Sequence, residues 1–139
     1  MIDALTAMGS VFLDPYLIFL IFITTVLGVI LGVLPGLGAT TGAALLLPFT
    51  LTLDPVHAIT VLATIYVSAT FAGSITAILI NTPGTSAAAA TTFDGYPLAQ
   101  KGEAGRALGI AVVSSTIGGI FSVIVLCIAA PMLARVAYE

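Results

Sequence analysis

The chain has 139 residues, of which 60% are hydrophobic and 6% are charged, and its formal net charge is −3. Soluble domains carry about 25% charged residues, so this chain could not cover its own surface in water. The small net charge offers no basic surface to nucleic acid, and we expect no nucleic-acid partner. We predict a single membrane-embedded region over residues 1–139, with the lipid bilayer as its main neighbour.

Charged residues divide the chain into three uncharged runs, at residues 15–53, 55–93 and 107–134, when His57 is taken as neutral. A membrane-spanning helix needs about 20 apolar residues, since it rises about 1.5 Å per residue across a hydrocarbon core about 30 Å thick. An unbroken helix through either of the first two runs would be about 58 Å long. Both runs must therefore break inside the membrane.

The first run contains one crossing, residues 16–34, which is rich in Leu, Ile, Phe and Val. Pro35-Gly36 follows at once, and this pair favours a break because proline lacks an N–H group and glycine admits a positive φ. Mostly small residues then continue toward Pro48. We predict a re-entrant segment or half-helix at 35–48.

The second run has the same pattern. A crossing at 56–81 is followed by Pro83-Gly84 and by Thr, Ser and Ala residues, so a second broken segment is predicted at 83–93. Turn-forming and charged residues predict a polar loop at 94–106, and the third run predicts a plain crossing at 107–130. The pattern indicates an all-α polytopic membrane protein with about three transmembrane crossings and two Pro-Gly-interrupted re-entrant or half-helix segments.

A broken membrane helix exposes unpaired N–H groups at the start of its second half, with the positive end of the helix dipole behind them. Such a start can bind an anion without Lys or Arg. Discontinuous helices near the membrane midplane recur in secondary transporters. The candidate substrate-binding residues are therefore Pro35, Gly36, Gly38, Thr40, Thr41, Asn81, Pro83, Gly84, Thr85 and Ser86. Asn81 and Asp94 are candidate ligands of a coupling cation.

Structural explanations compete with this binding site. Pro and Gly are common in membrane helices, where a kink can serve packing alone. The spacing of Gly28, Gly32 and Gly36 equally suits close packing between helices. His57 follows Asp54-Pro55, and this position indicates a solvated residue at a helix start rather than a proton relay.

Enzyme chemistry is not expected. The chain has one His and one Cys, with scattered acidic residues, so it offers no Ser-His-Asp arrangement and no set of metal ligands. No cofactor is expected either. The single cysteine, Cys127, lies in an apolar stretch and is interpreted as a small packed hydrophobic residue.

Three stretches form a long and ordered signature: residues 32–41 (GVLPGLGATT), 73–85 (GSITAILINTPGT) and 93–109 (FDGYPLAQKGEAGRALG). Together they resemble the large membrane subunit, or permease, of the tripartite tricarboxylate transporter family. The resemblance covers roughly residues 15–125 and only the N-terminal portion of such a permease. We therefore expect the chain to be a fragment of a larger permease with further crossings.

The resemblance implies a multi-pass protein of the bacterial inner membrane. It implies a secondary transporter, a symporter driven by an H⁺ or Na⁺ gradient, for citrate-like tricarboxylates or related carboxylates. The implied partners are a small membrane subunit, a periplasmic solute-binding protein and the remaining part of the permease. Both Pro-Gly segments would contribute to the substrate pathway. The alternative is a non-transporting membrane module that only packs with partner subunits.

Overall fold

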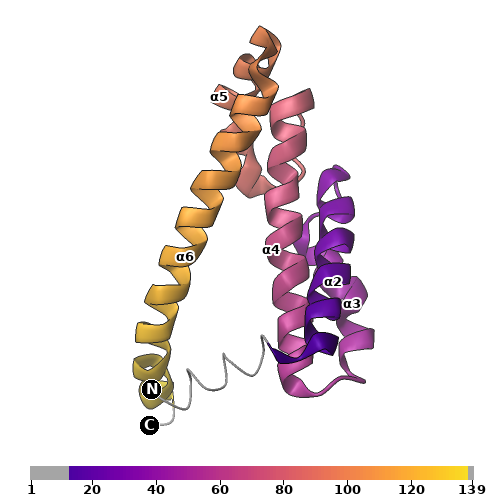
Figure 1. Cartoon of the computed structure of the whole chain (residues 1–139), viewed down its shortest axis with the longest axis vertical. Coiled ribbons are helices and arrows are strands. Elements are labelled where there is room, and N and C mark those ends of the chain that lie inside the picture. The colour runs from indigo at the N-terminus through magenta and orange to yellow at the C-terminus, as the bar shows by residue number, and fades with distance from the viewer. Residues whose placement is uncertain (1–12, 138–139) are drawn as a thin grey trace.

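The computed structural model describes residues 13–137, and over this range the chain forms helices and no strand. Three helical stretches are long and apolar enough to cross a membrane: Pro15–Val33, Pro55–Ile80 and Ser86–Ala130. The prediction of an all-α polytopic membrane protein is therefore confirmed. Figure 1 shows the helices side by side, with the last one inclined away from the others.

Helix α2 (Pro15–Val33) begins with a charged cap. The Asp14 carboxylate accepts hydrogen bonds from the backbone N–H groups of Tyr16 at 2.9 Å and of Leu17 at 3.3 Å, and Pro15 occupies the first helical position, where no N–H is needed. Partial burial opposes ionisation of Asp14, but these two donors and His57 outweigh it and hold its pKa below the usual value. The helix ends at Val33, just before Pro35-Gly36.

Helix α3 (Ala39–Thr50) leads the chain back along α2 to the end at which α2 began. Helix α4 (Pro55–Ile80) then starts beside the start of α2. The His57 side chain proves this neighbourhood, since its Nε2 lies 3.1 Å from Asp14 Oδ2 while its Nδ1 contacts the Asp54 carboxylate. His57 is thus a paired residue at the junction of two helix starts, rather than the solvated residue that its position in the sequence predicted.

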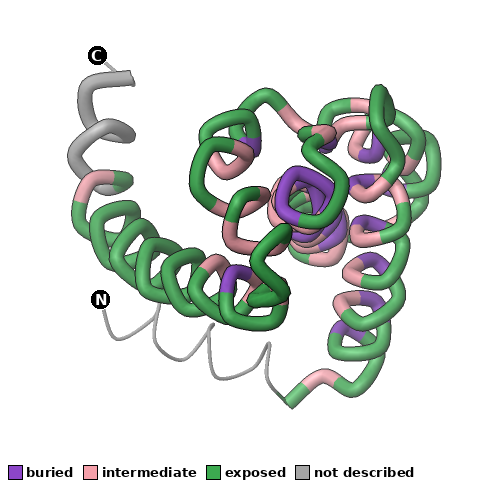
Figure 2. Tube along the Cα trace, turned by 90° about the horizontal axis from the view of Figure 1, so that it is seen from above, coloured by how far each residue is buried: buried purple, intermediate pink, exposed green. Residues whose placement is uncertain are grey.

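Helices α2 and α4 run in the same direction and pack closely through small residues. A Cβ atom added to Gly32 would lie 2.2 Å from the carbonyl oxygen of Ala69, and one added to Gly28 would lie 1.9 Å from the hydroxyl of Ser68. The packing role proposed for the first two glycines of the Gly28–Gly36 series is therefore correct. Buried residues gather on α4 and on the faces turned toward it (Figure 2).

Beyond Ile80 the chain turns back along α4. Asn81 caps the helix in the left-handed conformation, with φ at 57°. The N–H of Thr82 then bonds to the carbonyl of Thr76, and the N–H of Gly84 to the carbonyl of Gly73, both at 3.3 Å. Thr82 bonds to Thr76, and Gly84, two residues later in the chain, bonds to Gly73, which lies earlier in α4. This extended segment therefore runs back along α4 and is re-entrant.

The chain then rises again as a 3₁₀ turn, η1 (Ser86–Ala90), which continues into α5 (Thr91–Leu98) and a π-helical turn, η2 (Ala99–Glu103). The segment 94–106, for which a polar loop was predicted, is therefore helical. The chain reverses its direction between α5 and the last helix. The non-helical residue at this turn is Gly102, whose φ of 83° suits glycine. Glu103 and Arg106, two of the charged residues that indicated a loop, form an exposed ion pair of 2.8 Å across this junction.

The last helix, α6 (Ala104–Ala137), begins three residues before the predicted crossing and continues beyond it. It packs against α4 and α5 near its start, where Ala107 is buried. Farther along it diverges from α4 (Figure 1) and exposes apolar side chains, including Ile117, Phe121 and Ile128. This continuous apolar surface of α6 is suited to contact with lipid or with further protein, and not with water.

Candidate functional site

The two Pro-Gly segments meet at one cavity of about 270 Å³. Its lining comes from the α2–α3 connection and the start of α3, from the middle of α4, and from the segment that leads into η1. The described residues that line it include no Lys, Arg, Asp or Glu. They are Gly36, Gly38, Ala39, Thr40, Tyr66, Thr70, Gly84, Thr85, Ser86 and Ala87.

Two helix N-termini lie at this cavity. Helix α3 runs from the cavity toward the start of α2, whereas η1 and α5 run from the cavity toward the end of α4. Their first residues, Ala39 and Ser86, both line the cavity. The Cβ that Gly38 lacks would lie 3.9 Å from the carbonyl oxygen of Gly84, which shows how close the two segments come. Both positive dipole ends consequently act on the same small volume.

The N–H groups at these starts have no side-chain cap. Neither Gly38, the cap residue of α3, nor Thr85, the cap residue of η1, makes a capping bond through a side chain. In α3 the first helical bond is donated by the N–H of Gly42 to the carbonyl of Gly38, at 3.1 Å, which leaves the earlier N–H groups of the turn without a helical partner. These donors are therefore oriented for an anion.

Two hydroxyl groups of the cavity, those of Thr40 and Ser86, differ from most helical hydroxyls of the chain, including that of Thr70 in the same lining. Thr24, Thr76 and others donate back to a carbonyl three or four residues earlier. Over the residues that the structure describes, no such bond is formed by Thr40 or Ser86, both of which are exposed to the cavity. Their hydroxyls are free to donate to a bound solute.

Thr85 has a different environment. Its hydroxyl oxygen is buried without a hydrogen-bond partner in the described part of the chain. It lies 2.8 Å from the position that a Cβ of Gly73 would take, so it faces α4 more than the open volume. An unpaired buried hydroxyl costs about 1–3 kcal/mol, and a solute oxygen that reached it would remove this cost.

The glycines of the two Pro-Gly pairs serve different purposes. Gly36 has a φ of +90° and open space around it, so it is needed for the turn itself. Gly84 is needed for close approach, because an added Cβ would lie 2.2 Å from the carbonyl oxygen of Gly32 and 2.9 Å from Cα of Gly73. Through these contacts the second segment packs against both α2 and α4, and Gly84 lines the cavity at this point.

The predicted substrate-binding residues divide into two groups. Those that line the cavity are Gly36, Gly38, Thr40, Gly84, Thr85 and Ser86. The other four do not line it. Pro35 and Pro83 lie exposed in the adjoining turns, Thr41 is half-buried in the first turn of α3, and Asn81 is exposed at the end of α4. Asp94 lies in α5 and lines a separate pocket.

Four lining residues were not among the predicted residues: Ala39, Ala87 and two polar residues of α4, Tyr66 and Thr70. Tyr66, Thr70 and Ser74 are spaced four residues apart, so they share one face of the helix. A stripe of three polar residues on one face of a crossing is a signal that the sequence does contain. Its meaning depends on what packs beside that face, which only the fold supplies.

Residues 18–139 match the Tripartite tricarboxylate transporter TctA family. The chain is also 47% identical over 127 residues to a protein of Agrobacterium vitis described as an "Uncharacterized 52.8 kDa protein in TAR-I ttuC' 3'region". This similarity covers 91% of the chain and 25% of that relative, so the chain spans about a quarter of the relative's length. No solved structure matches the chain.

The family is described as one of transporters, which is consistent with the expectation that the chain is not an enzyme. The described residues contain no group of three or more His, Cys, Asp and Glu that could hold a metal ion. Because the family match extends over most of the chain, the sequence resemblance is confirmed: the chain belongs to the tripartite tricarboxylate transporter TctA family.

Proposed function

We propose that this chain forms half of the substrate site of an ion-gradient-driven secondary transporter for tricarboxylates or related carboxylates in the bacterial inner membrane. The observation that supports the proposal most strongly is the pair of helix N-termini, at Ala39 and Ser86, that face one cavity. The remaining part of the permease completes the enclosure. A small membrane subunit and a periplasmic solute-binding protein deliver the substrate.

The chemistry of the cavity suits a carboxylate. Backbone N–H groups and the hydroxyls of Thr40 and Ser86 supply donors, and the two dipoles supply positive potential without a cationic side chain. The positive end of each helix dipole corresponds to about half an elementary charge. It acts in a protein-lined space, where electrostatic interactions are stronger than in water. Ligand cavities commonly begin at about 300 Å³, so a volume of about 270 Å³ suits a small anion rather than a large one.

Uptake of labelled citrate tests this proposal. The measurement uses a full-length family permease in which these residues are the same, produced with its partner subunits. Thr40→Val and Ser86→Ala each remove one free hydroxyl, and a hydrogen bond to a charged group contributes about 1.5–3 kcal/mol. We expect each variant to raise the half-saturating citrate concentration about 10- to 100-fold.

Thr60→Val is the matched control, because its hydroxyl donates to the carbonyl of Val56 at 2.8 Å and lies on α4 away from the cavity. It should leave uptake unchanged. Wild-type affinity in both Thr40→Val and Ser86→Ala would contradict the site assignment. Gly84→Ala is not suitable for this purpose, since its added methyl overlaps backbone atoms and would disturb the fold.

A non-transporting assembly module is the second candidate, and the surface of α6 favours it. Gly105, Gly109, Gly118 and Gly119 all have open space around them, and small residues of this kind support close contact between membrane helices. Stable co-purification of the chain with the rest of the permease, combined with no effect of Thr40→Val and Ser86→Ala on uptake, would favour this second function.

A further inference from the structure

We propose that the pocket between α4, α5 and α6 binds the monovalent coupling cation, with the Asp94 carboxylate as its charged ligand. This inference rests on the proposed function and gives its driving ion a location. The pocket has a volume of about 320 Å³. It is distinct from the carboxylate cavity, since the two share no lining residue.

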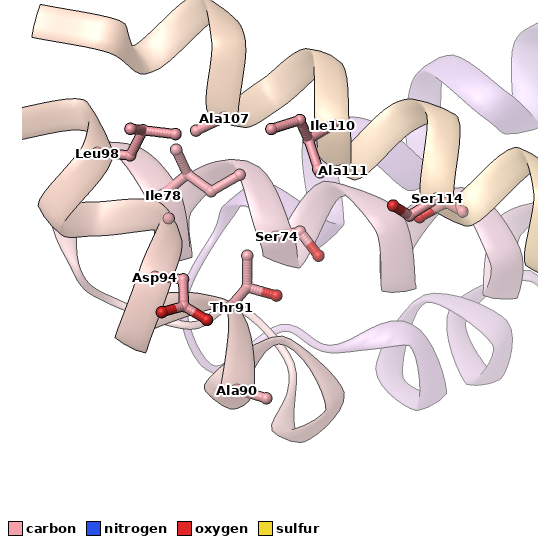
Figure 3. A pocket seen from close by; sticks show the side chains of 12 residues that line it. Ser74, Ile78, Ala90, Thr91, Asp94, Leu98, Ala107, Ile110, Ala111 and Ser114 are labelled. Atoms are coloured by element: carbon pink, nitrogen blue, oxygen red, sulfur yellow. The ribbon is translucent and has the colours of Figure 1, made fainter.

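The oxygen atoms of this pocket come from three different helices. Asp94 and Thr91 belong to α5, Ser74 to α4, and Ser114 and Ser115 to α6. Figure 3 shows Asp94 and Thr91 near each other, with Ser74 and Ser114 following in a row. Apolar side chains of Ile78, Leu98 and Ile110 complete the lining. Carboxylate and hydroxyl oxygens are the ligands that hard cations prefer.

These oxygen atoms are free to bind an ion. Nearby hydroxyls, such as those of Thr70, Thr92 and Thr116, donate to carbonyls of their own helices. Within the described part of the chain, no such bond is formed by Ser74, Thr91, Ser114 or Ser115, and Asp94 has no ion-pair partner. The lining of the pocket therefore carries oxygen atoms from three helices that form no hydrogen bond or ion pair within the described part of the chain.

The charge of the lining selects the class of ion. Asp94 is the single charged residue among the described residues that line the pocket. One carboxylate balances one positive charge, whereas a divalent ion would keep a net charge in an apolar surrounding. A monovalent cation is therefore expected. Na⁺ would use the carboxylate and the hydroxyls, whereas a proton would use the carboxylate alone.

The cation pocket is linked to the carboxylate cavity through an intermediate hollow. That hollow shares Tyr66, Thr70 and Ala87 with the carboxylate cavity, and Ser74 and Ser115 with the cation pocket. Ser86 and Asp94 also lie on one continuous helical stretch, about 14 Å apart along its axis when the longer rise of the 3₁₀ turn η1 is included. A bound cation and a bound carboxylate thus act on the same short helix from its side and from its start.

The expected coupling follows from this separation. Two opposite unit charges about 14 Å apart attract each other by about 1.2 kcal/mol at an effective dielectric constant of about 20, which is close to a tenfold change in affinity. Cation binding should therefore raise citrate affinity about tenfold, and citrate should raise cation affinity by the same factor. Neutralising Asp94 should remove this dependence without removing the citrate donors at Ala39 and Ser86.

The test measures citrate affinity of a purified full-length family permease with these residues, at constant ionic strength, with Na⁺ replaced by choline and at several pH values. For the wild type we expect affinity to rise about tenfold with Na⁺, or with falling pH if the ion is a proton. Asp94→Asn should abolish this rise. Ser74→Ala with Ser114→Ala should weaken the Na⁺ response and leave a proton response intact.

Glu103→Gln is the control, because it also removes a carboxylate but lies outside the pocket in η2. It should keep the full cation response. Thermal stabilisation by Na⁺ or by acid in the absence of citrate is measured in parallel. If citrate binding is absent but this stabilisation remains, the proposed function is overturned and the cation site is not. An Asp94→Asn permease with the wild-type cation response in both measurements overturns the cation site. If Asp94→Asn does not fold, an unchanged Na⁺ and pH response of the serine variants together with Asp94→Glu overturns it.

Discussion

Replacing Gly84 by Ala should separate the two halves of the carboxylate cavity. The added Cβ would lie 2.2 Å from the carbonyl oxygen of Gly32 and 2.9 Å from Cα of Gly73. The first distance is roughly 1 Å shorter than van der Waals contact. Because both neighbours are backbone atoms of long helices, neither can move alone. Overpacking of this kind costs about 1–3 kcal/mol, and we expect a value at the upper end.

The assay is thermal unfolding of the purified full-length permease in detergent, followed by helical circular dichroism. Gly84→Ala should lower the midpoint by several degrees. Gly109→Ala is the matched control, because it adds the same methyl to an exposed position of α6 with nothing within 4 Å, where alanine favours the helix by about 1 kcal/mol. It should be neutral or slightly stabilising. An unchanged midpoint for Gly84→Ala would show that this close contact does not exist.

Three other changes have defined outcomes. Gly36→Ala forces an alanine into a φ of +90° without any clash, so it should cost only about 1–2 kcal/mol of backbone strain, and a loss as large as that of Gly84→Ala would contradict this assignment. Tyr66→Phe removes a hydroxyl at the cavity wall and should weaken citrate binding several-fold, whereas Tyr96→Phe, outside the cavity, should not. Asp14→Ala removes the cap of α2 and should lower the unfolding midpoint by a few degrees at neutral pH. Because the pKa of Asp14 is lowered from 3.8 in the folded protein, its contribution is fully present above that pH and disappears as the pH falls below it, so the two unfolding curves should converge in acid. A difference that persisted at the lowest pH would exclude an electrostatic cap.

The fold class could be predicted from local information. Long uncharged runs need helices in a bilayer, because every backbone group must find a partner there. Run length alone also required the breaks near Pro35 and Pro83. The segment 94–106 was different, since its Pro, Gly and charged residues are typical of a loop. The structure instead continues the helix from η1 through this segment and places the one non-helical residue at Gly102, and residue preferences do not indicate this continuation.

The candidate site was predictable only in part, and for a related reason. The dipole argument selected residues at helix starts, and Gly38, Thr40 and Ser86 do line the cavity. Whether the two starts line one cavity depends on the re-entrant backbone beside α4, which the contacts of Gly73 and Gly84 determine. Such contacts between distant residues leave no periodic pattern. For the same reason, the sequence pattern could not separate Asn81 from Asp94 as candidate ion ligands. Asp94 lines the cation pocket, whereas Asn81 lies exposed at the end of α4.

Protection of substituted cysteines by citrate tests the central claim most directly. Cys127 is exposed in this structure, and not packed as its apolar surroundings in the sequence predicted, so its equivalent in a full-length family permease is first replaced by Ser. Thr40→Cys and Ser86→Cys then place one thiol at each helix start, and Thr60→Cys serves as the control. The account predicts that citrate slows maleimide labelling at both helix starts, with the same concentration dependence, and leaves the control unaffected. Unchanged labelling at both helix starts in saturating citrate, under conditions in which the permease transports it, would contradict the account.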